Sequence, residues 1–147
     1  MSGRDILLQR LIDAPIEVTF HHWVDSDARR CWCAPQDDWL AEATSDLRVG
    51  GAWSVMFGPT ADEMYTIEGA YYEVDPPNRL VYTSTFRYPD GRSFETLTTV
   101  TFEARSGQTL VTFLDAGYPA GEDLGVFNTG TVAVLAAFAR AVEASTE

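Results

Sequence analysis

Hydrophobic and polar residues recur along this chain with periods that change twice, and each period predicts a different kind of element. Near the N-terminus, Ile16, Phe20 and Trp23 recur at i, i+4 and i+7, which is the spacing of one apolar helical face. Pro15 suits the first position of that helix, and the apolar segment 5–13 before it predicts a strand.

A second short helix is expected directly after the first. Asp25 has a side chain that caps helices well, and it predicts a helix that runs to about Cys33. Pro35 then ends the helical segment, because proline cannot continue a helix. The first part of the chain is therefore predicted to be a strand followed by two short helices.

From residue 38 onward the pattern has period two, as in strands that bury one face. In the segment 52–57, Trp53, Val55 and Phe57 share one side of the predicted strand. The short connections imply antiparallel pairing and exclude a βαβ layout. Further strands are predicted over residues 38–48, 64–74, 80–88, 93–103 and 109–115, separated by glycine and proline turns.

Gly50 and Gly51 mark one of these turns, between two predicted antiparallel strands. We expect at least one of the two glycines to have a positive φ, which glycine adopts at no steric cost. Asp46 and Arg48 flank the turn, and we expect them to fix the hairpin rather than to carry out chemistry.

Helical period returns in residues 122–144, where one apolar stripe predicts a long helix. At ~1.5 Å per residue this helix is roughly 30 Å long, enough to cross a small sheet. One helix cannot cover both faces of about seven strands, so we expect it to lie in the concave side of a curved sheet, in an α+β fold. The stripe consists of Phe127, Thr131, Val134, Leu135, Phe138 and Val142.

Composition narrows the class of partner. The chain has 147 residues, of which 46% are hydrophobic and 22% charged, as expected for one globular domain. Its formal net charge of −12 repels phosphate, so we expect no nucleic-acid partner and no anionic membrane surface. Without a leader or an apolar run near the ~20 residues of a membrane span, we expect a cytoplasmic protein.

The chain has two histidines and two cysteines, which are its candidate zinc ligands: His21, His22, Cys31 and Cys33. One residue separates the two cysteines, which disfavours a disulfide between them. The adjacent histidines point in different directions from a helix, and a closed zinc site needs about four converging ligands. We therefore expect structural thiols, surface histidines, no metal and no cofactor.

The chain contains no G-x-S-x-G, P-loop, Rossmann glycine or H-E-x-x-H motif, so its catalytic residues, if any, are unknown from the sequence. Glu42, Glu68 and Glu95 alternate with aromatic and hydroxyl residues on predicted strands. A glutamate that pointed into a cavity would have a raised pKa and could serve as an acid or base. Alternation in a one-sided sheet favours the solvated, convex face for all three.

Four segments, taken in order, resemble a known family. Residues 14–35 carry A-P, then F, W and D, and W-C-A-P at the end; residues 46–53 read D-L-R-V-G-G-A-W. Residues 69–80 read G-A-Y-Y-E-V-D-P-P-N-R-L, and residues 106–112 read S-G-Q-T-L-V-T. The set is similar to the START-like (SRPBCC, helix-grip) superfamily, and within it to the family named after the activator of heat-shock-protein-90 ATPase.

The resemblance implies a single START-like domain over residues 1–147, with a cavity between the curved antiparallel sheet and the C-terminal helix. It favours a cavity lining over an ordinary core for the aromatic residues, with tyrosine hydroxyls as the few polar anchors. The residues expected to line this cavity are Trp53, Phe57, Tyr65, Tyr71, Phe113, Phe127 and Thr131.

The chain departs from the family's pattern in three places. Ser26-Asp27 stands where members often have P-E, Cys33 replaces the second tryptophan of W-W-x-P, and Gly130-Thr131 stands where the last helix usually opens with G-W. Each change removes bulk near the expected rim of the cavity, which bears on the size of a ligand and its route of entry.

These expectations favour the binding of a small lipophilic or aromatic ligand. A polyketide cyclase/aromatase-like enzyme is an alternative, because it would use the same cavity with an inward Glu, Tyr or Arg. A protein-interaction, co-chaperone-like module is a third, and it could form a homodimer through the sheet edges or the convex face. An inward, shielded carboxylate would favour the enzyme, and a cavity filled by side chains would favour the interaction module.

Overall fold

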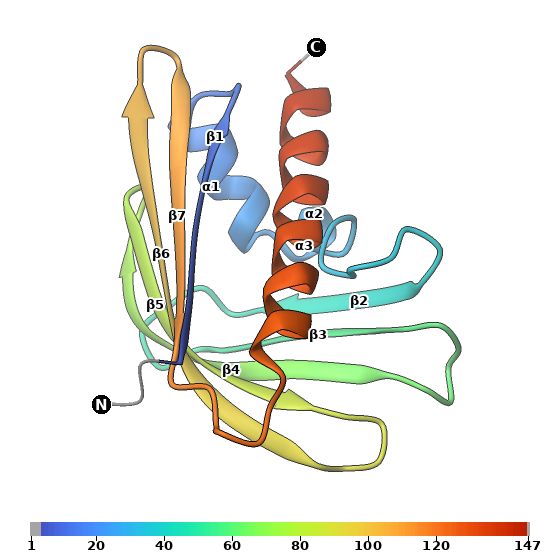
Figure 1. Cartoon of the computed structure of the whole chain (residues 1–147). Coiled ribbons are helices and arrows are strands. Elements are labelled where there is room, and N and C mark those ends of the chain that lie inside the picture. The colour runs from blue at the N-terminus through green and yellow to red at the C-terminus, as the bar shows by residue number, and fades with distance from the viewer. Residues whose placement is uncertain (1–3, 147) are drawn as a thin grey trace.

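A seven-stranded antiparallel sheet curls around one long helix in a computed structural model of the chain, which describes residues 4–146 (Figure 1). The sheet order is β1-β7-β6-β5-β4-β3-β2, so that β2 to β7 form a continuous meander and β1 pairs with its last strand. The strands are β1 (Asp5–Ile12), β2 (Leu40–Ser45), β3 (Ala52–Gly58), β4 (Tyr65–Asp75), β5 (Arg79–Arg87), β6 (Ser93–Arg105) and β7 (Gln108–Ala116).

Three helices complete the fold: α1 (Ile16–Val24), α2 (Ser26–Arg29) and α3 (Leu124–Ser145). This confirms the predicted α+β helix-grip class, with its curved sheet and long C-terminal helix. Pro15 lies just before α1 rather than in its first turn. The side chain of Asp25 accepts a hydrogen bond from the backbone N–H of Ala28, which confirms that it caps the second helix.

Two predicted elements were too long. The prediction for α2 extended to about Cys33, but the helix ends at Arg29, and backbone bonds such as Cys33 N–H to Arg29 O continue it as turns. The strand predicted over residues 38–48 is the shorter β2, because the chain turns away from its partner strand after Ser45.

The turn between β2 and β3 confirms the expected use of glycine. Gly50 has a φ of 82°, and its backbone N–H donates to Tyr71 O at 2.8 Å. Within the same turn, Gly51 N–H donates to Arg48 O, and the guanidinium of Arg48 pairs with Asp46 at 2.8 Å. The turn is thus tied both to itself and to β4.

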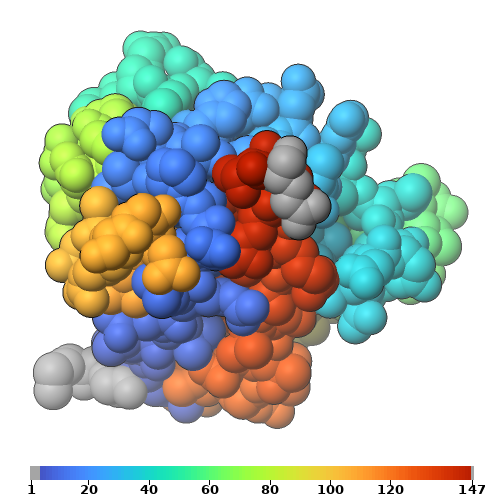
Figure 2. All heavy atoms as spheres, turned by 90° about the horizontal axis from the view of Figure 1, so that it is seen from above, coloured from blue at the N-terminus to red at the C-terminus, as the bar shows by residue number. Residues whose placement is uncertain are grey.

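The two halves of α3 have different surroundings. In the C-terminal half, Leu135, Phe138, Ala139 and Val142 are buried, and α1 lies alongside (Figure 2). The ring of Phe138 contacts Trp23 of α1 at a centroid distance of 5.0 Å. The N-terminal half has no fully buried residue and instead faces a hollow on the concave side of the sheet.

The apolar character of α3 corrects one expectation. We expected no apolar run near the length of a membrane span. By length and composition alone, however, this helix is long and apolar enough to cross a membrane. In the fold its apolar stripe packs against α1 and the sheet, and the backbone N–H of Asp13 donates to the carboxylate of Glu143 at 2.9 Å. It is therefore the core helix of the domain.

The backbones of β4 and β5 come very close to each other at Gly69. A Cβ atom built on Gly69 would overlap the backbone carbonyl oxygen of Thr83, and a strand backbone cannot move as a side-chain end can. We expect Gly69→Ala to lower the free energy of unfolding by about 1–3 kcal/mol. Chemical denaturation followed by circular dichroism measures this loss.

Gly130→Ala in α3 is the matched control, because a Cβ there meets no atom within 4 Å. An alanine inside a helix should stabilise the fold by about 0.5–1 kcal/mol relative to glycine. Equal effects of the two substitutions would contradict the close approach at Gly69.

Candidate functional site

A cavity of about 380 Å³ lies between the sheet and the N-terminal half of α3. Alternate residues of each strand point into it, as the period of a strand requires. Strands β3 to β7 contribute Trp53, Val55, Phe57, Tyr65, Ile67, Tyr82, Ser84, Phe86, Phe94, Thr96, Thr98, Phe113 and Asp115. The opposite wall comes from α3, with Val126, Phe127, Gly130, Thr131, Val134 and Leu135, and from Trp23, Arg29, Trp32, Cys33, Pro35 and Trp39.

Six of the seven residues expected in the cavity lie in its lining: Trp53, Phe57, Tyr65, Phe113, Phe127 and Thr131. Tyr71 lies outside the lining. Its side chain is 1% exposed, its hydroxyl shares a 2.8 Å hydrogen bond with Ser45 Oγ, and its ring meets the edge of Tyr82. The alternation that placed Tyr71 on the concave face does not reveal that Tyr82 lies next to it.

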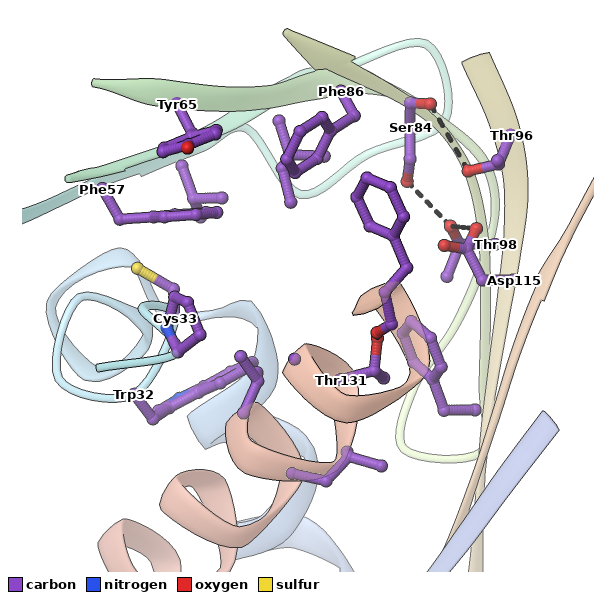
Figure 3. Close-up of a pocket in the computed structure, with 18 of the residues that line it drawn as sticks. Trp32, Cys33, Phe57, Tyr65, Ser84, Phe86, Thr96, Thr98, Asp115 and Thr131 are labelled. Atoms are coloured by element: carbon purple, nitrogen blue, oxygen red, sulfur yellow. Dashed lines mark hydrogen bonds between the residues drawn. The ribbon is translucent and has the colours of Figure 1, made fainter. Parts of the chain in front are cut away.

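One side of the cavity is made of parallel aromatic rings. Trp39 and Tyr65 stack with an interplanar angle of 7°. Phe57 stacks on Tyr65 at 15° (Figure 3). Cys33 lies across the cavity from Phe57 and Tyr65 in the same view. Burial raises the pKa of the Cys33 thiol to about 11, so that it stays protonated at neutral pH.

Near the N-terminal end of α3 a second aromatic group packs around Phe127. Its ring lies 5.0 Å from that of Phe86 and 5.3 Å from those of Phe94 and Tyr118, measured between centroids. Tyr118 follows β7, and its position brings the end of that strand against the helix.

A buried polar cluster interrupts the aromatic walls, and we call it the Asp115 cluster: Ser84, Thr98, Asp115 and Tyr118. Thr98 Oγ1 donates to Asp115 Oδ1 at 3.0 Å, and the hydroxyl of Tyr118 donates to Oδ2 at 2.6 Å. Ser84 Oγ joins Thr98 Oγ1 at 2.7 Å (Figure 3). Sequence reasoning missed this cluster, although Val111, Phe113 and Asp115 alternate along one face of β7.

Asp115 is 8% exposed, and its burial raises the pKa of the carboxyl group. Hydrogen bonds from Thr96, Tyr118 and Thr98 oppose this rise, but they do not cancel the loss of hydration. The pKa of Tyr118 is raised too, by burial and by the neighbouring carboxylate. A group with a raised pKa that faces a cavity is suited to proton transfer.

The three glutamates considered from the sequence lie elsewhere. Glu42 and Glu95 are exposed, and Glu68 forms an ion pair with Arg87 at 3.2 Å. None of the three belongs to the cavity lining.

Arg29 is a buried cation in the lining, and sequence reasoning missed it. Its side chain is buried, with the guanidinium carbon 4.6 Å from the ring centre of Trp53 and 5.7 Å from that of Trp32. Trp23 and Tyr82 lie within 5.9 Å of the same carbon. Its Nε and Nη1 atoms have no hydrogen-bond partner, and neither has the indole nitrogen of Trp53.

The residues considered as metal ligands do not converge. Cys31 is exposed, Cys33 is buried, and both thiols are free. His22 uses its Nδ1 atom in a 2.9 Å contact with Val18 O within α1. Within residues 4–146, no group of three or more His, Cys, Asp or Glu side chains is placed to hold a metal ion.

The raised pKa of Asp115 predicts a pH effect on stability. Between the carboxyl's ordinary pKa, about 3.9, and its raised value in the fold, the folded state binds more protons than the unfolded chain. The free energy of unfolding therefore falls as pH rises through this window. Asp115→Asn removes this loss. The melting temperature of the variant minus that of the wild type should therefore increase as pH rises above about 4.

Thermal melts of both proteins between roughly pH 4 and 8 measure this difference. Asp62→Asn in the exposed β3–β4 turn is the matched control, and its difference from the wild type should stay constant. A constant difference for Asp115→Asn as well would contradict the raised pKa.

Structures with the same fold have been solved for proteins from several bacteria. A protein from Chromobacterium violaceum is 26% identical, with a TM-score of 0.81 and coverage of 95% of this chain and 97% of the other. A protein from Rhizobium leguminosarum is 28% identical, also with a TM-score of 0.81, and the coverages are 95% and 93%.

The AHSA1-like protein from Aeromonas hydrophila is 25% identical, with a TM-score of 0.79 and coverages of 97% and 94%. DynU16, from the dynemicin biosynthetic locus, is 19% identical and shares the fold with a TM-score of 0.75, over 96% of this chain and 48% of its own. Among curated proteins none matches this chain. The family model described as "Activator of Hsp90 ATPase homolog 1-like protein" matches residues 13–143, and the chain therefore belongs to that family.

Proposed function

We propose that this protein binds a small lipophilic, aromatic molecule in the cavity between the sheet and α3. The observation that carries the proposal is the cavity itself, about 380 Å³ in volume and walled mainly by aromatic rings. Ligand sites of ~300–1,000 Å³ usually combine apolar walls with a few polar groups, as this one does. Side chains do not fill the hollow, which separates this proposal from a pure interaction module.

The arrangement of the rings favours a flat ligand. Trp39, Phe57 and Tyr65 present nearly parallel faces, with interplanar angles of 7–19°. Aromatic molecules gain most when they stack offset on such faces or meet ring edges. The free thiols of Cys31 and Cys33 agree with a reducing, cytoplasmic location, which we retain as part of the proposal.

Thr131→Trp tests the proposal by filling the hollow. Thr131 lines the cavity, and its hydroxyl donates to Phe127 O at 2.8 Å within the helix. In a packed core an added indole would strain the fold by ~1–3 kcal/mol. In a hollow it should leave the melting temperature unchanged or slightly higher, and it should abolish binding of the neutral fluorescent probe N-phenyl-1-naphthylamine.

Val132→Trp is the matched control, because Val132 is 46% exposed on the next position of the same helix. It should bind the probe as the wild type does. A Thr131→Trp protein that melts several degrees lower and still binds the probe would contradict ligand binding in the cavity.

A second candidate, an enzyme of the polyketide cyclase/aromatase kind, is favoured by one observation. Asp115 is an inward, shielded carboxyl group with a raised pKa, hydrogen-bonded to Thr98 and Tyr118. In its ionised form such a group can remove a proton from a carbon next to a ketone. The enolate that this leaves is the nucleophile of an aldol-type ring closure.

Exchange of the C1 protons of 2-tetralone into D₂O, followed by NMR, tests this candidate without knowledge of the natural substrate. The base takes a proton from C1, the ketone becomes an enolate, and a deuteron from solvent replaces the proton. We expect acceleration of roughly 10²-fold by the wild type, a typical value for a positioned base, and none by Asp115→Asn. Equal rates for both proteins would rule out Asp115 as the base.

A further inference from the structure

We propose that the ligand of this cavity carries a carboxylate or a similar planar anionic oxygen group, which binds Arg29. This inference rests on the proposed function and specifies the chemical class of its ligand. The site is the part of the cavity walled by Trp23, Trp32, Trp53 and Tyr82, which we call the arginine pocket.

Arg29 is a buried cation without an anionic partner. Its side chain is 5% exposed, and no carboxylate among the described residues lies within ion-pairing distance, 4.0 Å, of its guanidinium. Its Nε and Nη1 atoms donate to no acceptor. Buried charges are normally paired, because a charge that leaves water without a partner is costly. The residue therefore has donors to offer to a bound molecule.

The surrounding rings stabilise the cation but do not replace an acceptor. The guanidinium carbon lies 4.6–5.9 Å from four ring centres, within the range of cation–π attraction. Ring faces attract the positive charge as a whole, whereas the N–H groups of a guanidinium need oxygen acceptors in its own plane. A carboxylate matches that planar fork with two parallel hydrogen bonds.

The frame that holds the guanidinium is itself fixed by hydrogen bonds. Trp32 Nε1 donates to His22 O at 3.0 Å, and Trp23 Nε1 donates to the hydroxyl of Tyr82 at 3.2 Å. Asp25 caps the short helix that carries Arg29. Such a frame keeps the arginine in place before a ligand arrives, which lowers the entropic cost of binding.

Other donors lie near the same place. The indole N–H of Trp53 has no acceptor, and Trp53 is the closest ring to the guanidinium. The hydroxyl of Tyr82 accepts from Trp23 and keeps its own proton, because burial raises its pKa to about 12. The buried carboxyl group of the lining, that of Asp115, already binds Thr98 and Tyr118. The arginine pocket thus offers unpaired donors, whereas the acceptor described in it, the Tyr82 hydroxyl, already binds Trp23.

Two ligands of nearly the same size and shape test the inference: 2-naphthoate and 2-naphthamide. The first is an anion with two acceptor oxygens, and the second is neutral, with an NH2 donor in place of one oxygen. Each displaces N-phenyl-1-naphthylamine from the wild type, and the fluorescence titration gives its dissociation constant. We expect 2-naphthoate to bind at least ~10-fold more tightly than 2-naphthamide, because charge-assisted hydrogen bonds are stronger than neutral ones. Arg29→Met should reduce the preference to less than about 2-fold and leave 2-naphthamide within about 3-fold of its wild-type affinity.

Arg30→Met is the matched control, because Arg30 is the exposed neighbour of Arg29 and should keep the wild-type preference. Arg29→Lys keeps the charge without the planar fork, and it should retain part of the preference. Circular dichroism establishes that each variant is folded. If Arg29→Met does not fold, two comparisons of 2-naphthoate with 2-naphthamide, on the wild type and on Arg29→Lys, still test the role of Arg29.

The outcomes separate this inference from the proposed function. If neither the probe nor either naphthalene binds the wild type, the proposed function fails. If the probe binds but 2-naphthamide binds as tightly as 2-naphthoate, the anionic class is wrong and ligand binding stands. A preference for 2-naphthoate that persists in Arg29→Met overturns the assignment to Arg29.

Discussion

The structure depends on a mismatch between one helix and the concave face that it must cover. The sheet has seven strands, whereas α3 buries only Leu135, Phe138, Ala139 and Val142 of its 22 residues. Packing against α1 buries the C-terminal half of the helix, whereas the N-terminal half contacts the sheet through Phe127 and lines the hollow. Because protein interiors are otherwise close-packed, a hollow of this size is held open by the architecture and not by loose side chains.

This constraint explains why polar groups can lie in the cavity wall. A charged or hydroxyl group in a filled core must find every partner among its neighbours, and Arg29 does not. The buried carboxyl group and the buried guanidinium of the wall are held differently. Asp115 is satisfied by Thr98 and Tyr118, whereas Arg29 is held by ring faces that provide no acceptor. A site with one satisfied carboxyl group and one unpaired guanidinium favours ligands that bring an acceptor to the guanidinium.

The sequence predicted the order of elements well, because periodicity and turn residues determine them locally. Trp53 and Phe57 could be assigned to the inner face from alternation alone, and the helical stripe placed Phe127 and Thr131 opposite them. Alternation does not report how far an inward side chain reaches. Tyr71 therefore could not be distinguished from a lining residue, although it packs beside Tyr82 outside the lining.

The same reasoning missed the two charged residues of the site, Asp115 and Arg29, for two different reasons. Asp115 was within reach, because it continues the inward face of β7 from Phe113, but a terminal aspartate is more often a turn residue. Arg29 could not be found, because α2 has only four residues and no helical face can be read from them.

The burial of Arg29 depends on rings contributed by α1, β3 and β5 and by the turns after α2. These elements meet only in the folded protein. Proteins often depart from local folding preferences at functional sites, so polar groups that break the local pattern are candidate functional residues. In this protein both such groups lie in the wall of one cavity, so a single ligand could contact them together.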